Sequence, residues 1–247
     1  MNKVSVIIIT GNEENNITDC LKSVQWADEI VVVDSESTDR TVEIARQFTD
    51  KVFIQKWLGF SKQKEYAVSL ASNDWVLSID ADERITEELA EEILKSDLSC
   101  NGYFIGRRNH FLRKEINSCK WNVDFQMRFF SRKKTVMYDR LVHEGFIAEK
   151  PNGTFKNKMI HYTYDSIESA LSKINNYSTL QAEETADKKN SSGLHVFMHT
   201  ISAFLKFFIS YKGYKDRKYG LIISFFNSVT TLLTYAKIWE MKTKRNT

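Results

Sequence analysis

Four mainly apolar runs alternate with helical segments over the first hundred residues of this 247-residue chain. In chain order, the runs and segments lie at residues 4–9, 16–25, 30–33, 40–48, 52–55, 62–71 and 75–79. A strand that is apolar on both faces needs cover on both sides, which a parallel sheet with flanking helices provides. The alternation therefore predicts a Rossmann-like wound α/β sheet.

Polar residues follow three of these predicted strands, at the point where each strand ends. They are Thr10, Asn12 and Glu13 after the first strand, Asp34 and Ser35 after the second, and Asp80 and Asp82 after the fourth. Wound sheets bind ligands at the carboxyl ends of their strands, so these side chains are expected to line one site. No Gly-x-Gly-x-x-Gly follows the first strand, which argues against a dinucleotide oxidoreductase.

The two aspartates, Asp80 and Asp82, are separated by one small residue at the end of an apolar run. Carboxylates with this spacing, at the turn after a strand, are able to converge on one hard cation such as Mg²⁺ or Mn²⁺. A cation held there would neutralise a diphosphate. Alternatively, the two carboxylates cap the helix that is expected to start near Thr86.

Beyond residue 100 the pattern changes to short segments, which we interpret as mixed strands over the open side of the site, and a helical period returns at residues 166–188. One proline and nine glycines leave no linker between large domains. The three cysteines are far apart and are expected to be reduced thiols of a cytoplasmic protein. The apolar run near the amino terminus is too short to predict a signal peptide.

The carboxyl-terminal tail, residues 194–247, is basic and aromatic. Nine Lys and Arg residues against two acidic ones give it a net charge of +7, whereas the rest of the chain carries −4. Residues 194–208 have the period of an amphipathic helix, and residues 219–236 are uncharged but carry a polar stripe. We therefore expect peripheral attachment to an anionic membrane surface, on the inner face of the cytoplasmic membrane, and no nucleic-acid partner. Packing of these helices on the core, or a homodimer interface, is the alternative.

Four motifs stand in order along the first third of the chain: Val-Ile-Ile-Ile-Thr-Gly-Asn-Glu-Glu (6–14), Val-Val-Val-Asp-Ser-Glu-Ser-Thr-Asp (31–39), Gly59 with the helix through Lys64 and Ala67, and Asp-Trp-Val-Leu-Ser-Ile-Asp-Ala-Asp-Glu (74–83). Together they resemble the inverting glycosyltransferases of family two, which have the nucleotide-sugar-binding GT-A fold. Later segments, at 126–130 and 142–144, are similar to the branch containing lipopolysaccharide core β-glucosyltransferases. The resemblance implies a GT-A catalytic domain over residues 1–165, with a nucleotide-sugar half (1–100) and an acceptor half (101–165), and a helical extension over residues 166–247.

For the donor, the resemblance implies that Thr10, Asn12 and Glu13 line the nucleotide pocket, with Ser35 beside them. Asp34 is expected to meet the uracil or the ribose, and a turn-capping role is its alternative. Lys64 is expected to approach the diphosphate, unless it is only a helix-surface lysine. Asp82 is then the more direct metal ligand, and Asp80 faces the ribose or sugar.

For the chemistry, an inverting transfer needs a base that takes the proton from the acceptor hydroxyl. The resemblance places Asp124 at this position, where aromatic neighbours would desolvate it, and Glu144 is the reserve candidate. His143 is a candidate third metal ligand, with a structural histidine as the alternative. Arg128 is expected to balance diphosphate charge, unless it forms a salt bridge on a strand edge; Arg107 and Arg108 are secondary candidates for the same role.

The function implied by the resemblance is metal-dependent, inverting transfer of a sugar, glucose being the first choice, from a UDP-sugar to a lipid-linked saccharide such as the lipopolysaccharide inner core. Another cell-surface polysaccharide, a peptide acceptor, or a nucleotidyltransferase activity are the alternatives. A binding module without catalysis is a further rival, but it gives no reason for carboxylates at successive strand ends. Two departures from the family pattern matter: no aromatic residue stands near Gly11 to stack on the base, and Glu36 stands where the family usually has glycine.

Overall fold

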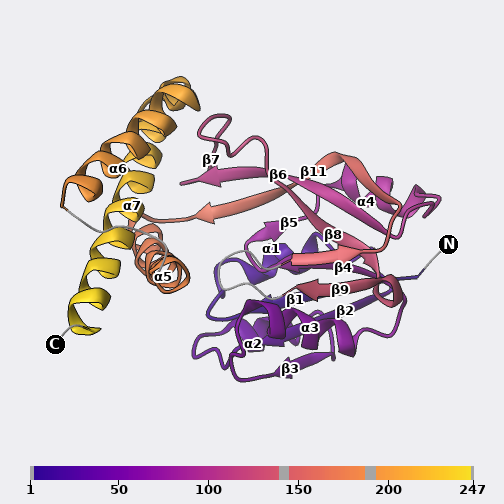
Figure 1. Cartoon of the computed structure of the whole chain (residues 1–247). Helices are drawn as coiled ribbons and strands as arrows, with labels where there is room; N and C mark the ends of the chain where they lie inside the picture. The colour runs from indigo at the N-terminus through magenta and orange to yellow at the C-terminus, as the bar shows by residue number, and fades with distance from the viewer. Residues whose placement is uncertain (1–2, 139–144, 187–192, 246–247) are drawn as a thin grey trace. The chain divides into compact units, whose positions relative to one another are not determined.

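The computed structural model of the chain describes residues 3–138, 145–186 and 193–245 (Figure 1). The chain divides into two compact units. Unit 1 comprises Met1–Arg108 and Asp124–His161, and unit 2 comprises Asn109–Val123 and Tyr162–Thr247.

A nine-stranded mixed sheet has the order β3-β2-β1-β4-β8-β6-β11-β5, with β7 paired to β6. Its strands are β1 (Val4–Thr10), β2 (Glu29–Asp34), β3 (Val52–Ile54), β4 (Trp75–Asp80), β5 (Glu83–Arg84), β6 (Gly102–Phe111), β7 (Lys114–Glu115), β8 (Phe125–Ser131) and β11 (Asn152–Tyr164). Strand β1 is parallel to β2 and β4, and β2 is parallel to β3. Strand β8 runs antiparallel to β4 and β6, so the sheet changes from parallel to mixed after β4.

Helices cover both faces of the parallel strands. They are α1 (Ile17–Lys22), α2 (Thr41–Ala45), α3 (Phe60–Leu70) and α4 (Glu87–Lys95). Alternate residues of β1 point into different cores: Val6 and Ile8 belong to the cluster with α1 and α4, while Ile7 and Ile9 belong to the cluster with α3. This two-sided burial is the reason for the mainly apolar sequence of β1.

A separate pair of antiparallel strands packs on the core cluster that contains Ile7 and Ile9. It follows a single 3₁₀ turn (Arg132–Lys134) and consists of β9 (Thr135–Tyr138) and β10 (Gly145–Ala148). Phe146 of β10 packs against Phe130 of β8 in a tilted arrangement, with ring centroids 4.2 Å apart. The predicted fold class, a Rossmann-like mixed sheet of the GT-A type, is confirmed.

Unit 2 is largely helical. Its helices are α5 (Ile167–Thr185), α6 (Gly193–Leu205) and α7 (Arg217–Arg245), with a π-helical turn (Lys206–Ser210) and a 3₁₀ turn (Gly213–Asp216) between the last two. Helix α7 packs against both α5 and α6 (Figure 1). Polar contacts join α7 to α5: Lys237 Nζ donates to Asn175, Ser178 and Thr179 at 2.6–2.8 Å.

Helices α6 and α7 of unit 2 carry several exposed apolar side chains. On α6, Leu194, Phe197 and Met198 are 71%, 61% and 57% exposed. On α7, Ser224 and Thr234 are buried while Phe225 is 53% exposed. The amphipathic extension predicted for this segment is present, but the polar stripe of α7 lies inside and its apolar stripe lies outside.

Candidate active site

The carboxyl ends of β1, β2 and β4 lie side by side at one edge of the sheet. Thr10 is the register partner of Asp34, and Ile9 is the register partner of Asp80. The structure therefore brings together three polar positions that the sequence suggested for one site. The pairing follows from the parallel register, because parallel strands present their carboxyl ends at the same edge.

The loop after β1 is tied to the loop after β2. Asn12 has a φ of 55°, and its Oδ1 accepts a hydrogen bond from the Thr38 backbone N at 2.8 Å. The Asn12 backbone N donates to Ser37 Oγ at 2.7 Å, and the Glu13 backbone N donates to Thr41 Oγ1 at 2.8 Å. Asn12 and Glu13 thus hold two loops together at the edge where a ligand is expected.

Asp34 is fully buried at the end of β2. Its Oδ1 accepts from the Ser37 backbone N at 2.8 Å, and its Oδ2 accepts from the Ser37 hydroxyl. This is the turn-capping arrangement that stood as the alternative for Asp34. A carboxylate has about four lone-pair sites, so such a cap does not by itself exhaust the acceptor capacity of Asp34.

Two buried oxygens at this edge lack a hydrogen-bond partner among the residues the structure describes: Thr10 Oγ1 and Gln63 Oε1. The orientation of the Gln63 amide is fixed, because its Nε2 donates to the Gln55 carbonyl and to Ser35 Oγ, each at 3.3 Å. Ser35 in turn donates its backbone N–H to the Thr10 carbonyl at 2.8 Å. Buried oxygens without partners are costly, and a bound ligand with N–H or O–H donors would satisfy them.

Asp80, at the end of β4, is paired with two cations. Lys64 Nζ of α3 lies 3.1 Å from Asp80 Oδ1, and Arg128 Nη2 of β8 lies 2.8 Å from Asp80 Oδ2. Burial by itself raises the pKa of Asp80, but Lys64 and Arg128 hold this pKa well below its ordinary value. Both cations, which were expected near a diphosphate, therefore contact the same carboxylate.

Asp82 faces a histidine that the sequence did not suggest. Its Oδ2 lies 3.5 Å from Nε2 of His161, which is on β11 beside Glu83. Two ligands of one octahedral cation with bonds of about 2.1 Å lie roughly 3 Å apart, so this pair is spaced to share a cation after a small adjustment. Over residues 3–138, 145–186 and 193–245 there is no preformed group of three or more His, Cys, Asp or Glu ligands. Substrate phosphates commonly complete the coordination of Mg²⁺, so two protein ligands are sufficient.

Glu83 and Arg107 extend the ionic contacts toward the predicted base. The Glu83 carboxylate is fully buried, and its Oε1 lies 2.7 Å from Arg128 Nη2 and 3.2 Å from Arg107 Nη1. Arg107 Nη2 lies 2.7 Å from Asp124 Oδ2. Burial disfavours the charged guanidinium of Arg107, but the carboxylates of Glu83 and Asp124 outweigh it and raise the pKa of Arg107. Asp124 is thus held by a guanidinium, a contact that the sequence did not suggest beside the expected aromatic neighbours.

Two of the remaining site candidates fall in the part of the chain between β9 and β10. His143 and Glu144 lie outside the described residues, as 139–144 are not described. Arg108, on β6, was a secondary candidate for the diphosphate. No local signal in the sequence identifies His161, since it is a single histidine within a long strand.

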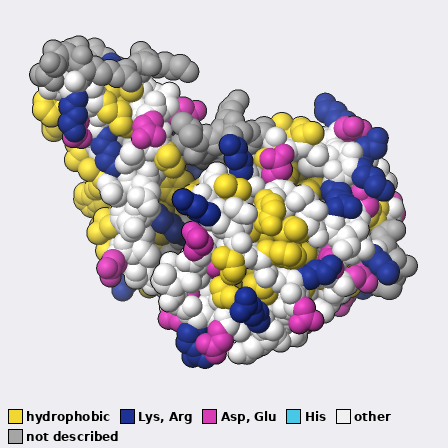
Figure 2. All heavy atoms as spheres, turned by 90° about the horizontal axis from the view of Figure 1, so that it is seen from below, with side chains coloured by type: hydrophobic (Ala, Val, Ile, Leu, Met, Phe, Trp, Pro, Cys, Tyr) yellow, Lys and Arg dark blue, Asp and Glu magenta, His cyan; other side chains and the backbone are white. Residues whose placement is uncertain are grey.

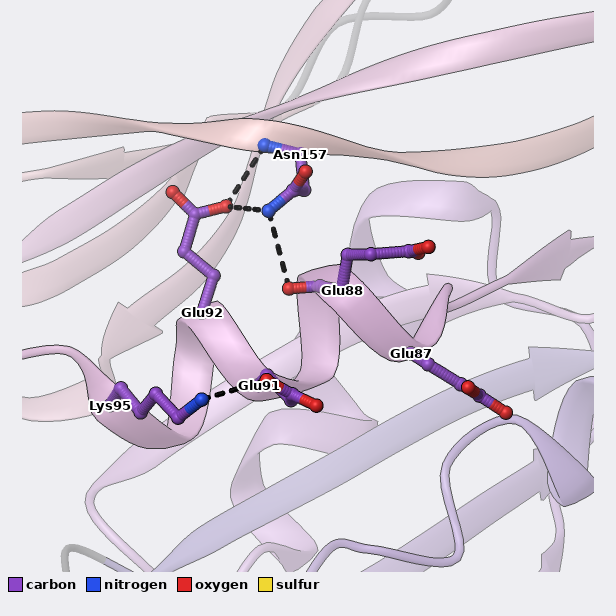
Figure 3. Close-up of a pocket in the computed structure, with 6 residues that line it drawn as sticks. All are labelled: Glu87, Glu88, Glu91, Glu92, Lys95 and Asn157. Atoms are coloured by element: carbon purple, nitrogen blue, oxygen red, sulfur yellow. Dashed lines mark hydrogen bonds and ion pairs between the residues drawn. The ribbon is translucent and has the colours of Figure 1, made fainter.

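A hollow beside α4 is acidic but lies away from these residues. Figure 3 shows that it is lined by Glu87, Glu88, Glu91 and Glu92, with Lys95 and Asn157 at its rim. Glu92 accepts two hydrogen bonds from Asn157, each of 2.9 Å, and Glu91 pairs with Lys95. The glutamates in the first turn suit the positive end of α4, whose cap is Thr86.

Comparison with known proteins gives consistent results over nearly the whole chain. An uncharacterized glycosyltransferase of Rickettsia typhi, RT0209, is 31% identical, with 99% of this chain and 89% of that protein covered. The lipopolysaccharide core biosynthesis glycosyltransferase LpsC of Rhizobium meliloti is 28% identical, with 96% and 92% covered. Among solved structures, S. aureus TarS 1–349 in complex with UDP-GlcNAc superposes with a TM-score of 0.51 at 17% identity, covering 93% of this chain and 81% of TarS.

The family model named "Glycosyl transferase family 2" matches residues 5–144. This range contains the edge formed by β1, β2 and β4, as well as Asp82, Arg107, Asp124 and Arg128. The match covers more than half of the chain, and the rickettsial similarity covers almost all of it. The chain therefore belongs to glycosyl transferase family 2 and is a glycosyltransferase.

Proposed function

We propose that this glycosyltransferase transfers a sugar, with glucose as the first choice, from a UDP-sugar to a lipid-linked saccharide with inversion at the anomeric carbon. The observation that carries this proposal is the convergence of Thr10, Asp34 and Asp80 at one sheet edge, with the Asp82–His161 pair following directly. Family membership removes the nucleotidyltransferase alternative.

The donor nucleotide would bind over the ends of β1 and β2. The buried, unsatisfied Thr10 Oγ1 and Gln63 Oε1 support this placement, because a nucleoside offers N–H and O–H donors. Asn12 and Glu13 shape the adjoining loop, and Asp34 with Ser35 would meet the base or ribose. UDP as the carrier is supported by the UDP-GlcNAc bound to the structurally similar TarS.

Mg²⁺ or Mn²⁺ would be held by Asp82 and His161, with Asp80 beside them. Carboxylate oxygen and neutral imidazole both suit Mn²⁺, and the 3.5 Å separation supports a shared ion. When bound, the ion supplies Lewis-acid stabilisation of the leaving diphosphate. Lys64 and Arg128, already in place at Asp80, would add positive charge to the same side of the donor.

Asp124 would accept the proton of the attacking hydroxyl. Its carboxylate is one-fifth exposed, so a substrate can approach it, and Arg107 holds it in place. A carboxylate in its ionised form is the form that acts as a base. Glu144 remains the reserve candidate.

The acceptor is proposed to be lipid-linked because a curated relative, LpsC, acts in lipopolysaccharide core biosynthesis by its name. Another cell-surface polysaccharide or a peptide is the alternative acceptor. A lipid-linked acceptor would be met at a membrane, and the helices of unit 2 support attachment there.

Two helical stretches of unit 2, Gly193–Ser210 and Gly213–Lys244, have the length and composition to cross a membrane, each with a mean hydropathy of 1.3. We propose that they lie in the interface instead, because Lys212 separates them and Lys215 and Lys218 lie near the start of the second stretch. Figure 2 shows apolar side chains beside Lys and Arg on the helical part of the molecule. Apolar side chains that face outward suit the lipid interface, and the basic side chains beside them suit anionic headgroups.

Calorimetric titration with UDP, in the presence and absence of Mn²⁺, tests the donor site. We expect Mn²⁺ to strengthen UDP binding at least roughly 10-fold, and Asp82→Asn or His161→Gln to abolish this gain. Asp50→Asn, an exposed aspartate beyond α2, is the matched control and should keep it. Equal UDP binding with and without Mn²⁺ would reject the metal-dependent mechanism.

Mass analysis of products tests the acceptor. The enzyme is incubated with UDP-glucose, Mn²⁺ and lipopolysaccharide truncated to its inner core, and a mass increase of one hexose on the saccharide is expected. A hexose found instead on a peptide or on another polysaccharide would replace the proposed acceptor. A β-linked product from the α-linked donor is required for inversion.

A further inference from the structure

Six side chains of unit 1 form one continuous ionic network. Its members alternate in charge in the order Lys64, Asp80, Arg128, Glu83, Arg107 and Asp124. They come from α3 and from residues at or next to four different strands, so the network crosses the sheet from the donor edge to the proposed base. Three cations and three carboxylates leave it with no net charge when all are ionised.

Glu83 is the centre of this network. Its side chain is fully buried, and its Oε1 accepts from both Arg128 and Arg107. Its Oε2 accepts from the backbone N of Asp80 at 2.9 Å. One carboxylate therefore fixes the main chain of Asp80, the arginine that neutralises Asp80, and the arginine that reaches Asp124.

Arg107 holds Asp124 at two points. Its Nε and Nη2 lie 2.8 and 2.7 Å from Asp124 Oδ2, and its backbone N donates to the Asp124 carbonyl at 2.9 Å. Asp124 precedes β8 and is not itself in a strand. The other carboxylate oxygen of Asp124, Oδ1, accepts a hydrogen bond from Gln126 Nε2 at 3.2 Å.

A role in stability alone is a weak explanation for such a network. Taking ions out of water is costly, and buried ion pairs are often no more stabilising than well-packed apolar residues. They do fix geometry, and a general base has to lie within hydrogen-bond reach of the proton that it removes. A displacement of about 1 Å at such a group costs roughly 100-fold in rate.

We propose that Glu83 and Arg107 are positioning residues that hold Asp124 in its reactive orientation and tie it to Asp80 at the donor end of the site. This inference rests on the proposed role of Asp124 as the base. Glu83 acts on both ends of the site, whereas Arg107 acts on the Asp124 end only.

The test compares Arg107→Met and Arg107→Lys with wild type. The reaction followed is UDP release from UDP-glucose, with lipopolysaccharide truncated to its inner core and, in parallel, with water as the acceptor. We expect Arg107→Met to lower kcat roughly 100-fold and Arg107→Lys roughly 10-fold, while UDP affinity by calorimetry changes less than about 2-fold. Arg46→Met, which removes an exposed arginine at the end of α2, should leave all values unchanged.

The pH profile separates positioning from a general loss of structure. The charged groups near Asp124 among the described residues include Arg107 of β6 and, through it, Glu83 of β5, while Lys158 of β11 lies over the neighbouring Phe125 ring at 5.6 Å. Removing the Arg107 cation disfavours the ionised base, so the acid limb of kcat/KM should move to higher pH in Arg107→Met and less in Arg107→Lys. Thermal melting of each variant confirms that it is folded at the assay temperature.

Glu83→Gln gives an independent readout. Because Glu83 contacts both arginines, this variant should weaken UDP binding and also lower kcat, and its effect on kcat should be less than multiplicative with Arg107→Met. Wild-type kcat and an unshifted pH profile in folded Arg107→Met would overturn the positioning role. Asp124→Asn distinguishes the two proposals: if it keeps full activity, the base assignment itself fails.

Discussion

At the scale of single residues, the backbone conformation of Glu36 favours glycine, the residue that the family usually has at this position. Its φ is 58°, in the left-handed region that favours glycine, and its side chain is exposed. An L-residue in this region loses about 1–2 kcal/mol relative to glycine. Glu36→Gly should therefore raise the free energy of unfolding by about 1 kcal/mol in urea denaturation.

The matched control for this change is Glu65→Gly, an exposed glutamate inside α3. Glycine in a helix interior costs about 1 kcal/mol, so the control should change stability in the opposite direction. A decrease in stability for both variants would show that the Glu36 backbone is not strained.

Glu29 makes a pH-dependent contribution to stability. It accepts hydrogen bonds from Ser5 and Ser72 and pairs with Lys51, and its side chain is 7% exposed. Burial raises the pKa of Glu29, but these partners lower it from 4.5 to about 2. Because the folded value is below the unfolded one, this stabilisation is complete above about pH 4.5 and is lost as the pH falls toward 2.

The difference corresponds to about 3 kcal/mol, so Glu29→Gln should lower the free energy of unfolding by up to that amount at pH 7. Near pH 2 the variant and the wild type should converge. Urea denaturation at both pH values measures this, with the exposed Glu91→Gln as a control that changes little at either pH. A stability loss of equal size at both pH values would contradict the assignment.

Thr10, Asp34 and Asp80 were predictable from the sequence as neighbours, because parallel strands ending in polar residues bring those residues to one edge. The sequence did not predict the positions of Glu83, Arg107 and His161. Their contacts join residues up to 79 positions apart, as in Asp82 and His161, and ion pairs at such separations follow no local period.

At the scale of elements, the strands of the parallel half were predictable because burial on both faces leaves a mainly apolar run. The helical period of α7 was also predictable from the sequence. The face of α7 that would be buried was not. Periodicity separates a polar stripe from an apolar one without showing which stripe meets the protein. In α7, buried hydroxyls such as Ser224 and Thr234 bond to carbonyls one turn earlier, at 2.7 and 2.8 Å, so a polar stripe can face inward.

The start of α7 depends on a close backbone approach. A Cβ on Gly220 would collide with the carbonyl of Gly213 in the preceding 3₁₀ turn, and neither group has a flexible side chain that could move. Gly220→Ala should therefore destabilise unit 2 by more than about 2 kcal/mol, detected as faster amide exchange along α7. Gly193→Ala, where a Cβ meets nothing within 4 Å, is the control and should change stability by less than about 1 kcal/mol. Equal exchange in both variants would reject the close approach.

At the scale of the whole molecule, unit 1 carries the proposed chemistry and unit 2 carries an outward apolar face next to basic residues. The proposed membrane attachment makes separate predictions for these two features. Apolar side chains should contribute affinity for any bilayer, while the lysines should add affinity only for anionic lipid.

Vesicle sedimentation of the full chain measures both contributions. Phe197→Ser combined with Phe225→Ser should weaken binding to phosphatidylcholine vesicles and to vesicles that also contain phosphatidylglycerol, because both rings are exposed. Replacing Lys212, Lys215 and Lys218 by Gln should weaken binding to the anionic vesicles only, by about 1 kcal/mol per lysine at low salt. Val136→Ser, which removes an exposed apolar residue of β9, should bind as wild type does. If the wild type binds neither vesicle but forms a dimer that the phenylalanine variant loses, the apolar face is covered by a second copy of the chain and the membrane proposal fails.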